Sequence, residues 1–186
     1  MLKSVDTSQN TQMKEKKVAN LLVSVGRLAI ENYAQIILKY NDQLTSDIKR
    51  TLTLIVNNLQ ICSQLKSRVL RLQEKLNRQE SETTESLPTY KQEKYKRLRE
   101  SLTRKEEKLS QLNQENIKLL LQIGKKFNEH RLLADKDNFK ELYQKITFLI
   151  NQRSEIESNL QNITVDNVDL NPLNLTNLLS AKRSEV

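Results

Sequence analysis

Positive charge is concentrated in one short stretch, residues 91–105, where seven Lys or Arg stand against Glu93 and Glu100 and the local charge is +5. Residues 66–78 hold five Lys or Arg against Glu74, a local charge of +4. Together the two stretches carry more positive charge than the chain's net +8. Clustered cations bind phosphates by counterion release or steer association with an acidic protein surface. We therefore predict a patch for phosphate or an acidic partner at Lys94, Lys96, Arg97, Arg99 and Arg104.

The same cations also have a simpler explanation, because Lys and Arg on the flank of a helix are ordinary solubilising residues. Residues 80–89 add three Glu, which would partly screen the patch. Tyr90 and Tyr95 lie beside the cations, but two aromatic rings are too few to indicate base stacking. Contact with nucleic acid is therefore an alternative and not the preferred prediction.

The chain offers little for catalysis or for a bound cofactor. Its one cysteine, Cys62, lies in an apolar row, and its one histidine, His130, is far along the chain, so no Cys–His pair is expected. Structural zinc sites need several ligands. With glycine only at Gly26 and Gly124, no glycine-rich phosphate loop is available. We predict no enzymatic activity, no metal and no cofactor.

Composition indicates which elements must position these residues. The 186 residues include only 2 Gly and 2 Pro, so turns are few and the elements between them are long. Aromatic residues make up 4% and charged residues 29%, which is typical of long helices with a narrow apolar stripe. The predicted fold class is all-α: an elongated hairpin of long, coiled-coil helices within a larger helical bundle.

Apolar residues spaced three and four apart locate the helices. Gly26 lies inside the first row, where it either permits close helix packing or is tolerated at a cost of roughly 1 kcal/mol; the second interpretation is preferred. The predicted organisation is a disordered N-terminus at 1–12, a long first helix at 13–79, a turn at 80–90, a second helix at 91–134, a third helix at 137–162 and a docking tail at 163–186. Such a turn would bring the two basic stretches side by side.

Narrow apolar stripes cannot bury themselves fully in one thin hairpin, so we expect helical protein partners in a hetero-oligomer. Asn116 falls at a core position of the heptad pattern, where a polar residue either fixes register or faces a wet gap. Leucines beyond Pro172 either anchor in a partner or fold back on the chain. The predicted partner-binding residues are Leu102, Leu109, Leu112, Asn116, Leu119, Ile123, Leu142, Ile146, Leu149, Ile156, Leu173, Leu175 and Leu178.

The sequence also bears on location. Residues 1–10 lack the apolar region of a secretory signal, and no window approaches ~18 apolar residues, so no transmembrane segment is expected. The lone cysteine fits a reducing nuclear or cytoplasmic setting. Residues 18–40 have an apolar face wide enough to consider binding at a membrane surface.

In length and composition the chain is similar to small coiled-coil subunits of eukaryotic kinetochore, spindle-associated, transcription-coactivator and vesicle-tethering assemblies. We expect a non-enzymatic scaffold or adaptor subunit that assembles by helix pairing. The two alternatives are a chromatin- or nucleic-acid-contacting subunit that uses the basic patch at the end of the hairpin, and a membrane-surface tethering adaptor.

Overall fold

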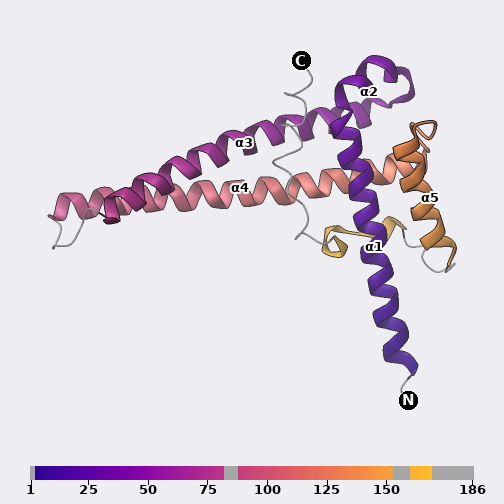
Figure 1. The fold of residues 1–186 in the computed structure, drawn as a ribbon, viewed down its shortest axis with the longest axis horizontal. Helices are drawn as coiled ribbons and strands as arrows, with labels where there is room; N and C mark the ends of the chain where they lie inside the picture. The colour runs from indigo at the N-terminus through magenta and orange to yellow at the C-terminus, as the bar shows by residue number, and fades with distance from the viewer. Residues whose placement is uncertain (1–2, 82–87, 153–159, 169–186) are drawn as a thin grey trace.

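The computed structural model describes residues 3–81, 88–152 and 160–168. All regular structure in these ranges is helical, which confirms the predicted all-α fold class. Figure 1 shows a long arm made by α3 and α4, and a head in which α1, α2 and α5 gather around one end of these two helices. The elements are α1 (Lys3–Glu31), α2 (Tyr33–Lys39), η1 (Asn41–Gln43), α3 (Ser46–Ser81), α4 (Thr89–Glu129), α5 (Asp137–Asn151), η2 (Leu160–Asn162) and η3 (Val165–Asn167).

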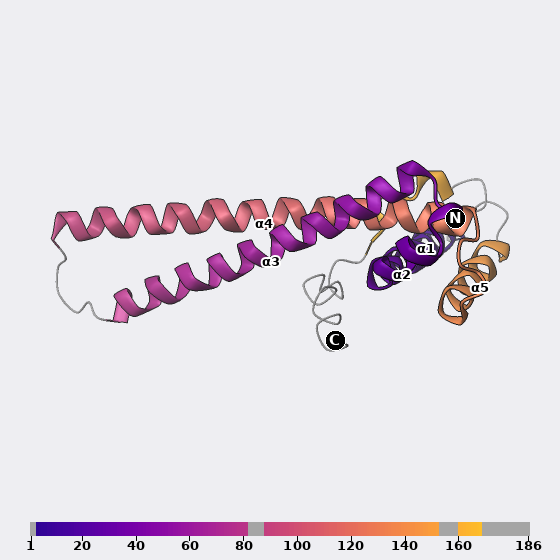
Figure 2. The ribbon, with the colours of Figure 1, turned by 90° about the horizontal axis from the view of Figure 1, so that it is seen from above.

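The arm is an antiparallel helical hairpin, as the sequence predicts (Figure 2). α4 has 41 residues and is therefore about 60 Å long at roughly 1.5 Å per residue. The two helices diverge toward the tip of the arm (Figure 2). The turn predicted at 80–90 is shorter, because α3 continues to Ser81 and α4 begins at Thr89. Residues 82–87 lie outside the described ranges.

The head contains the main hydrophobic core. α1 crosses α4 at a steep angle, and α5 lies beside α1 (Figure 1). Phe127 of α4 stacks on Phe139 of α5, with ring centroids 6.0 Å apart. Among the largest side chains that are fully buried here are Leu22, Ile36, Ile48, Leu52, Ile55, Leu120, Ile123, Phe127 and Ile146. α4 is thus both the spine of the arm and the central helix of the head.

The chain's two glycines meet where α1 crosses α4. A Cβ added to Gly26 would overlap the carbonyl of Leu120, lying 2.9 Å from its carbon. A Cβ added to Gly124 would overlap the carbonyl of Leu22, lying 2.6 Å from its carbon. The two backbones approach so closely that neither position has room for a methyl group. The preferred interpretation of Gly26, as a residue that the helix merely tolerates, is therefore wrong: Gly26 permits close helix packing. The sequence pattern could not show this, because the helix that packs on Gly26 lies far along the chain.

The single long helix predicted over 13–79 is also wrong, because the chain bends twice between α1 and α3. The Asn32 side chain donates to the carbonyl of Leu28 at 2.8 Å, where α1 ends. After α2, Leu44 is extended, and Thr45 accepts the backbone N–H of Ile48 at 3.3 Å, where α3 begins. The apolar spacing continues through both bends because every segment faces one core. At the N-terminus, α1 already begins at Lys3, so the prediction of disorder over 1–12 is corrected for residues 3–12, and residues 1–2 lie outside the described ranges.

The other boundaries shift for local reasons. α4 ends at Glu129 instead of residue 134, because Arg131 and Leu133 take left-handed backbone angles, with φ of 48° and 56°. The Tyr143 hydroxyl donates to the carbonyl of Leu132 at 2.6 Å and ties this turn to α5. α5 spans Asp137–Asn151, which is shorter than the predicted 137–162; residues 153–159 lie outside the described ranges, and η2 follows.

The first residues of the predicted docking tail fold back on the chain itself. Ile163 and Val168 are buried in the head, and η3 contacts α1 and α4. The Lys125 ammonium donates to the carbonyl of Ile163, and burial lowers the pKa of this lysine. The tail leucines Leu173, Leu175 and Leu178 lie outside the described residues, so their docking stays a prediction.

Candidate functional site on the hairpin arm

The arm has an apolar seam that is covered unevenly. On α3, Leu65, Val69 and Leu76 are buried and Leu72 is half-buried. On α4, by contrast, the seam leucines of the arm stay half-buried, because α3 alone cannot cover them: Leu98, Leu102, Leu109 and Leu112. Leu119 is also half-buried, although it packs against the core of the head. Three of the predicted partner-binding leucines, Leu102, Leu109 and Leu112, therefore lie together on an incompletely covered row.

Other predicted partner-binding residues belong to this chain's own interior. Asn116, Ile123 and Ile146 are each 0% exposed, so their assignment to a partner interface is corrected. Leu142 and Leu149 of α5 are half-buried against the core of the head. Ile156 lies outside the described residues. The seam pattern identified an apolar face correctly but could not show which helix covers it.

Asn116 and Cys62 form a polar contact inside the seam, where the arm joins the head. The Asn116 amide donates to the Cys62 sulfur at 3.7 Å. Among the described residues, Oδ1 of Asn116 and Nδ2 of Asn58 are buried without a hydrogen-bond partner. An unsatisfied buried polar atom costs about 1–3 kcal/mol. Another register of α3 against α4 would remove the sulfur contact from the Asn116 amide as well. The cost of unsatisfied polar atoms therefore favours the observed register.

We expect Cys62 to react slowly with a thiol reagent in the folded chain, because the side chain is 2% exposed and burial raises the pKa of its thiol. The hydrogen bond from Asn116 opposes this shift. The unfolded thiol ionises near pH ~8.5. The contribution of this thiol to the free energy of unfolding is therefore fully present below that pH, and it is lost as the pH rises through the higher pKa of the folded state. Rates measured across pH, with the urea-unfolded chain as control, test this; equal rates would show that the seam is open at Cys62.

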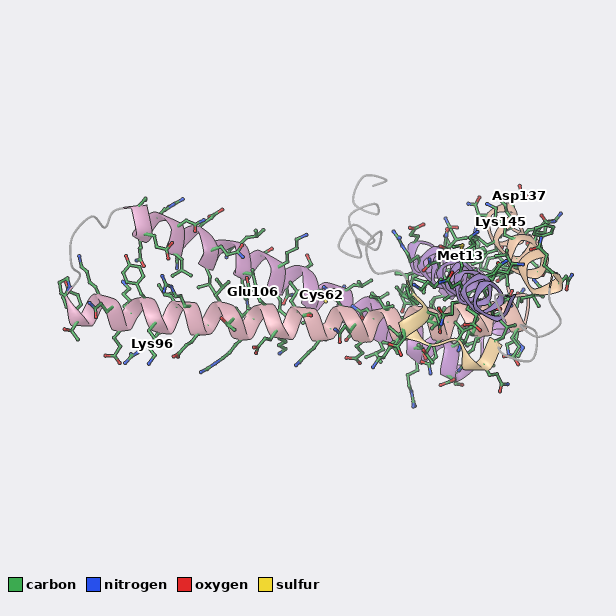
Figure 3. All side chains as sticks on the ribbon, turned by 90° about the horizontal axis from the view of Figure 1, so that it is seen from below. Met13, Cys62, Lys96, Glu106, Asp137 and Lys145 are labelled. Carbon is green, nitrogen blue, oxygen red and sulfur yellow. The ribbon has the colours of Figure 1, made fainter. Side chains whose placement is uncertain are left out.

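One edge of the arm is closed by complementary polar contacts. Gln73 donates to Glu106 at 3.0 Å, and Arg99 pairs with Glu80 at 2.7 Å. The Tyr95 hydroxyl also crosses between the helices, donating to a carbonyl of α3 at 2.9 Å. Glu106 lies between the helices in Figure 3. We call this edge, with Gln73, Glu80, Arg99 and Glu106, the bridged face.

The positions of these residues reveal which residues lie on the opposite edge. Gln73 and Glu106 each come directly after a seam position of their helix, as do Arg99 and Glu80. These four residues follow d positions of the heptad pattern. In an antiparallel pair, the residues directly before the a positions therefore line the other edge; the a positions are Val69, Leu76, Tyr95, Leu102 and Leu109. The residues before them on α3 are Arg68 and Lys75, and on α4 they are Lys94, Ser101 and Lys108. Cations thus face cations across this edge.

Further cations lie one helical turn along each row, since residues three or four apart share a side of a helix. Arg71 and Arg78 extend the α3 row, and Arg97 and Arg104 extend the α4 row. All of these side chains are exposed. We call this surface the basic face: Arg68, Arg71, Lys75, Arg78, Lys94, Arg97, Arg104 and Lys108.

The structure thus divides the predicted basic patch. Lys94, Arg97 and Arg104 belong to the basic face, whereas Arg99 is engaged with Glu80 on the bridged face. Lys96 projects from the side of α4 turned away from α3 (Figure 3). The basic stretch at 66–78 was identified, but none of its residues was named as a site residue, although the spacing of three, four and three from Arg68 to Arg78 can be read from the sequence.

Metal binding would need several ligand side chains held close together among the described residues. Within them, no group of three or more His, Cys, Asp or Glu is placed to hold a metal ion. A surface groove of about 740 Å³ near the tip is lined by side chains of both charges, among them Glu80, Lys96, Arg104 and Glu107. This mixture of exposed charges resembles a solvated helix surface more than a substrate pocket.

The membrane alternative meets an obstacle in the head. Along α1 the apolar residues Val18, Leu22 and Val25 are fully buried against the rest of the chain, so they offer no free face to lipid. In the described part of the chain, no single helix has the length and apolar character needed to cross a membrane; α1 and α2 satisfy the test only as a pair bent by 71°.

Comparisons with protein-family models, curated proteins and solved structures give no significant match. The function is therefore inferred from the arrangement of the chain's own residues.

Proposed function

We propose that this protein is a non-enzymatic adaptor subunit that assembles with other chains by helix pairing along its arm. The observation that carries the proposal is the half-buried leucine row of α4, made of Leu98, Leu102, Leu109 and Leu112. A neighbouring helix would remove the rest of this row from water. Full burial of an exposed leucine contributes about 1.5–3 kcal/mol, and each of these partly covered leucines would gain a fraction of that. The head, with its own core, supports the arm as a rigid base.

The shape of the molecule fits this role. The arm extends well beyond the head (Figure 1), so a partner can reach its seam without contacting the core. On α3 the exposed Leu70 and Ile61, at 51% and 41% exposure, add apolar surface beside the seam. A two-helix arm is only marginally stable by itself, and a third helix would complete a small bundle.

Heteromeric assembly in a reducing nuclear or cytoplasmic setting is part of the proposal. Its support is the lone free thiol at Cys62 and the length and composition of the chain. A kinetochore- or spindle-type assembly is our example of such a complex, and it rests on composition alone.

A pair of polar substitutions tests the role of the seam. We expect Leu102→Asn together with Leu109→Asn to abolish recovery of the partner chains that co-purify with the wild-type protein, while helicity by circular dichroism stays close to wild type. The matched control is Leu38→Asn, a leucine of α2 that is 82% exposed and far from the arm. Light scattering of the purified chain over a concentration series separates self-pairing from pairing with other chains.

Hydrogen exchange provides the second readout. In the purified chain we expect the amides of the arm to exchange faster than those of the head, and to gain protection when partner chains are present. Equal recovery of partners by the seam variant and the control would overturn the proposal. So would an arm that is as protected as the head in an isolated monomer.

A further inference from the structure

The basic face gathers cations close to the seam, whereas the acidic residues of the same stretches that lie off the bridged face, Glu74, Glu93, Glu100 and Glu107, are all at the heptad position farthest from it. Its eight members come from two helices that only the hairpin brings together. Glu93, beside this face, is paired with Arg97 at 3.0 Å, and among the described residues this is the only ion pair that involves the eight cations. The bridged face, by contrast, balances its charges within the hairpin through the Arg99–Glu80 pair. The fold therefore leaves a concentrated field of positive charge on one edge of the arm.

Like charges also face each other across this edge. Arg68 of α3 and Lys108 of α4 both precede seam residues and lie at similar heights along the arm. Positions that flank the seam of a helix pair usually form interhelical salt bridges, which two cations cannot do. A hairpin that needed only internal stability would be better served by a carboxylate at one of the two positions, as on the bridged face. An anion outside the chain would neutralise these opposed cations.

The length of the two rows of cations and the distance between them can be compared with the spacing of phosphates along duplex DNA. At about 1.5 Å per residue, the row from Arg68 to Arg78 is about 15 Å long, and the row from Lys94 to Lys108 is about 21 Å long. Packed helices lie about 8–10 Å apart, so the two rows are separated by at least that distance. The grooves of B-DNA are about 6 and 12 Å wide and are bordered by phosphates on both sides.

From this geometry we propose that the basic face binds the phosphate backbone of duplex nucleic acid, with the cations of both helices of the arm contacting phosphates. Five of the eight cations are Arg: Arg68, Arg71, Arg78, Arg97 and Arg104. Arginine's planar guanidinium binds phosphate through two parallel hydrogen bonds. Because these contacts go to the backbone, binding is independent of base sequence.

Two other polyanions fit the face less well. An acidic helix lying in the groove between α3 and α4 would leave Arg71, Arg78 and Arg104 uncontacted, because they lie farther from the seam than Arg68 and Lys108. A membrane-binding helix surface carries exposed aromatic or apolar residues beside its cations. The nearest exposed apolar or aromatic side chains in line with the two rows are Ile61 and Tyr90, and both lie beyond the ends of the rows and not among the cations. A long, flat array of phosphates uses both the inner and the outer cations.

This inference goes beyond the proposed adaptor function. Arg71 and Arg104 do not occupy seam positions, so their substitution leaves the leucine row intact. Partner assembly can therefore persist when phosphate binding is lost, and phosphate binding can be tested on the purified full chain alone.

The test is the double variant Arg71→Glu with Arg104→Glu, which changes one outer cation in each row. Binding to a fluorescent duplex of about 30 base pairs is followed by anisotropy between about 50 and 200 mM NaCl. We expect at least a tenfold loss of affinity, and a slope of log K against log salt that is smaller by about 1.8, since each lost phosphate contact removes about 0.9.

The matched control is Lys39→Glu with Lys140→Glu, which makes the same change in net charge at exposed positions of the head, on α2 and α5. We expect this control to lose less than threefold in affinity. Circular dichroism and the thermal midpoint of each variant establish that the fold is retained.

Three results would overturn the proposal. The first is that both variants lose affinity equally, which would mean that only net charge matters. The second is that the wild-type chain does not bind the duplex at the lowest salt concentration. The third is that poly-glutamate, or vesicles containing phosphatidylserine, binds more tightly than the duplex and loses affinity with the same variant, which would assign the face to an acidic protein or to a membrane surface.

Discussion

Gly124→Ala is expected to destabilise the head by about 2 kcal/mol, because the new methyl group would overlap the Leu22 carbonyl of α1. Backbone atoms cannot rotate away as a flexible side chain can, so α1 and α4 must separate. The sign of the effect is informative, since alanine is favoured over glycine inside a helix by about 1 kcal/mol. Without the close crossing, this substitution would therefore stabilise the protein.

Urea denaturation followed by circular dichroism measures this change. The control is Ser110→Ala at an exposed position of the same helix, where a small gain in stability is expected. Gly26→Ala should act in the same direction, because its methyl group would overlap the Leu120 carbonyl. Since either substitution alone opens the same crossing, the double variant should lose less than the sum of the two. A Gly124→Ala protein at least as stable as wild type would contradict the crossing.

The glycine crossing illustrates what one sequence can and cannot predict. The all-α hairpin follows from composition and apolar spacing, which are local properties of the chain. The role of Gly26 depends on Gly124, and no local pattern links two residues so far apart. The break at Asn32 has a related cause: the apolar spacing continues through it, because α1, α2 and α3 all face the same core. The apolar periodicity indicates which residues are buried. It does not indicate whether the chain continues as one helix or bends into a new one.

The candidate site shows the same division. The hairpin prediction correctly brought the two basic stretches together, but it selected cations that are neighbours in the chain. Membership of the basic face depends on which side of the seam a cation lies. Arg71 and Arg104 lie on the same side, whereas Arg99 lies on the other side and pairs with Glu80. Likewise, the seam prediction grouped Leu109 with Ile123, yet only Leu109 lies on the partly covered row. The extent of the head, built by α1 and α5, decides where along α4 a seam residue becomes a core residue.

Phe127→Ala is expected to have the largest effect on stability, a loss of about 3–5 kcal/mol. Phe127 is 0% exposed and is among the largest of the fully buried side chains. Its ring stacks on Phe139, so its removal leaves a cavity between α4 and α5 and also ends an aromatic contact. Because small domains are stable by about 5–15 kcal/mol, this loss would leave the head only marginally folded.

The chain provides its own control for this experiment. Phe148 of α5 is 64% exposed, so Phe148→Ala should change stability by no more than about 0.5 kcal/mol. A double-mutant cycle with Phe139→Ala then isolates the energy of the aromatic contact, which we expect at about 0.5–1.5 kcal/mol. Similar losses at Phe127 and Phe148 would contradict the observed core.

Hydrogen exchange on the Phe127→Ala variant extends this prediction to the arm. α4 is continuous from the head to the tip, and the arm's half-covered seam gives it little stability of its own. We therefore expect the amides of the arm to lose protection together with those of the head, although Phe127 makes no contact with the arm's seam leucines. If only the head lost protection, the arm would be an independent folding unit. Its leucine row would then be adequately covered by α3, and the case for a further helix against it would be weaker.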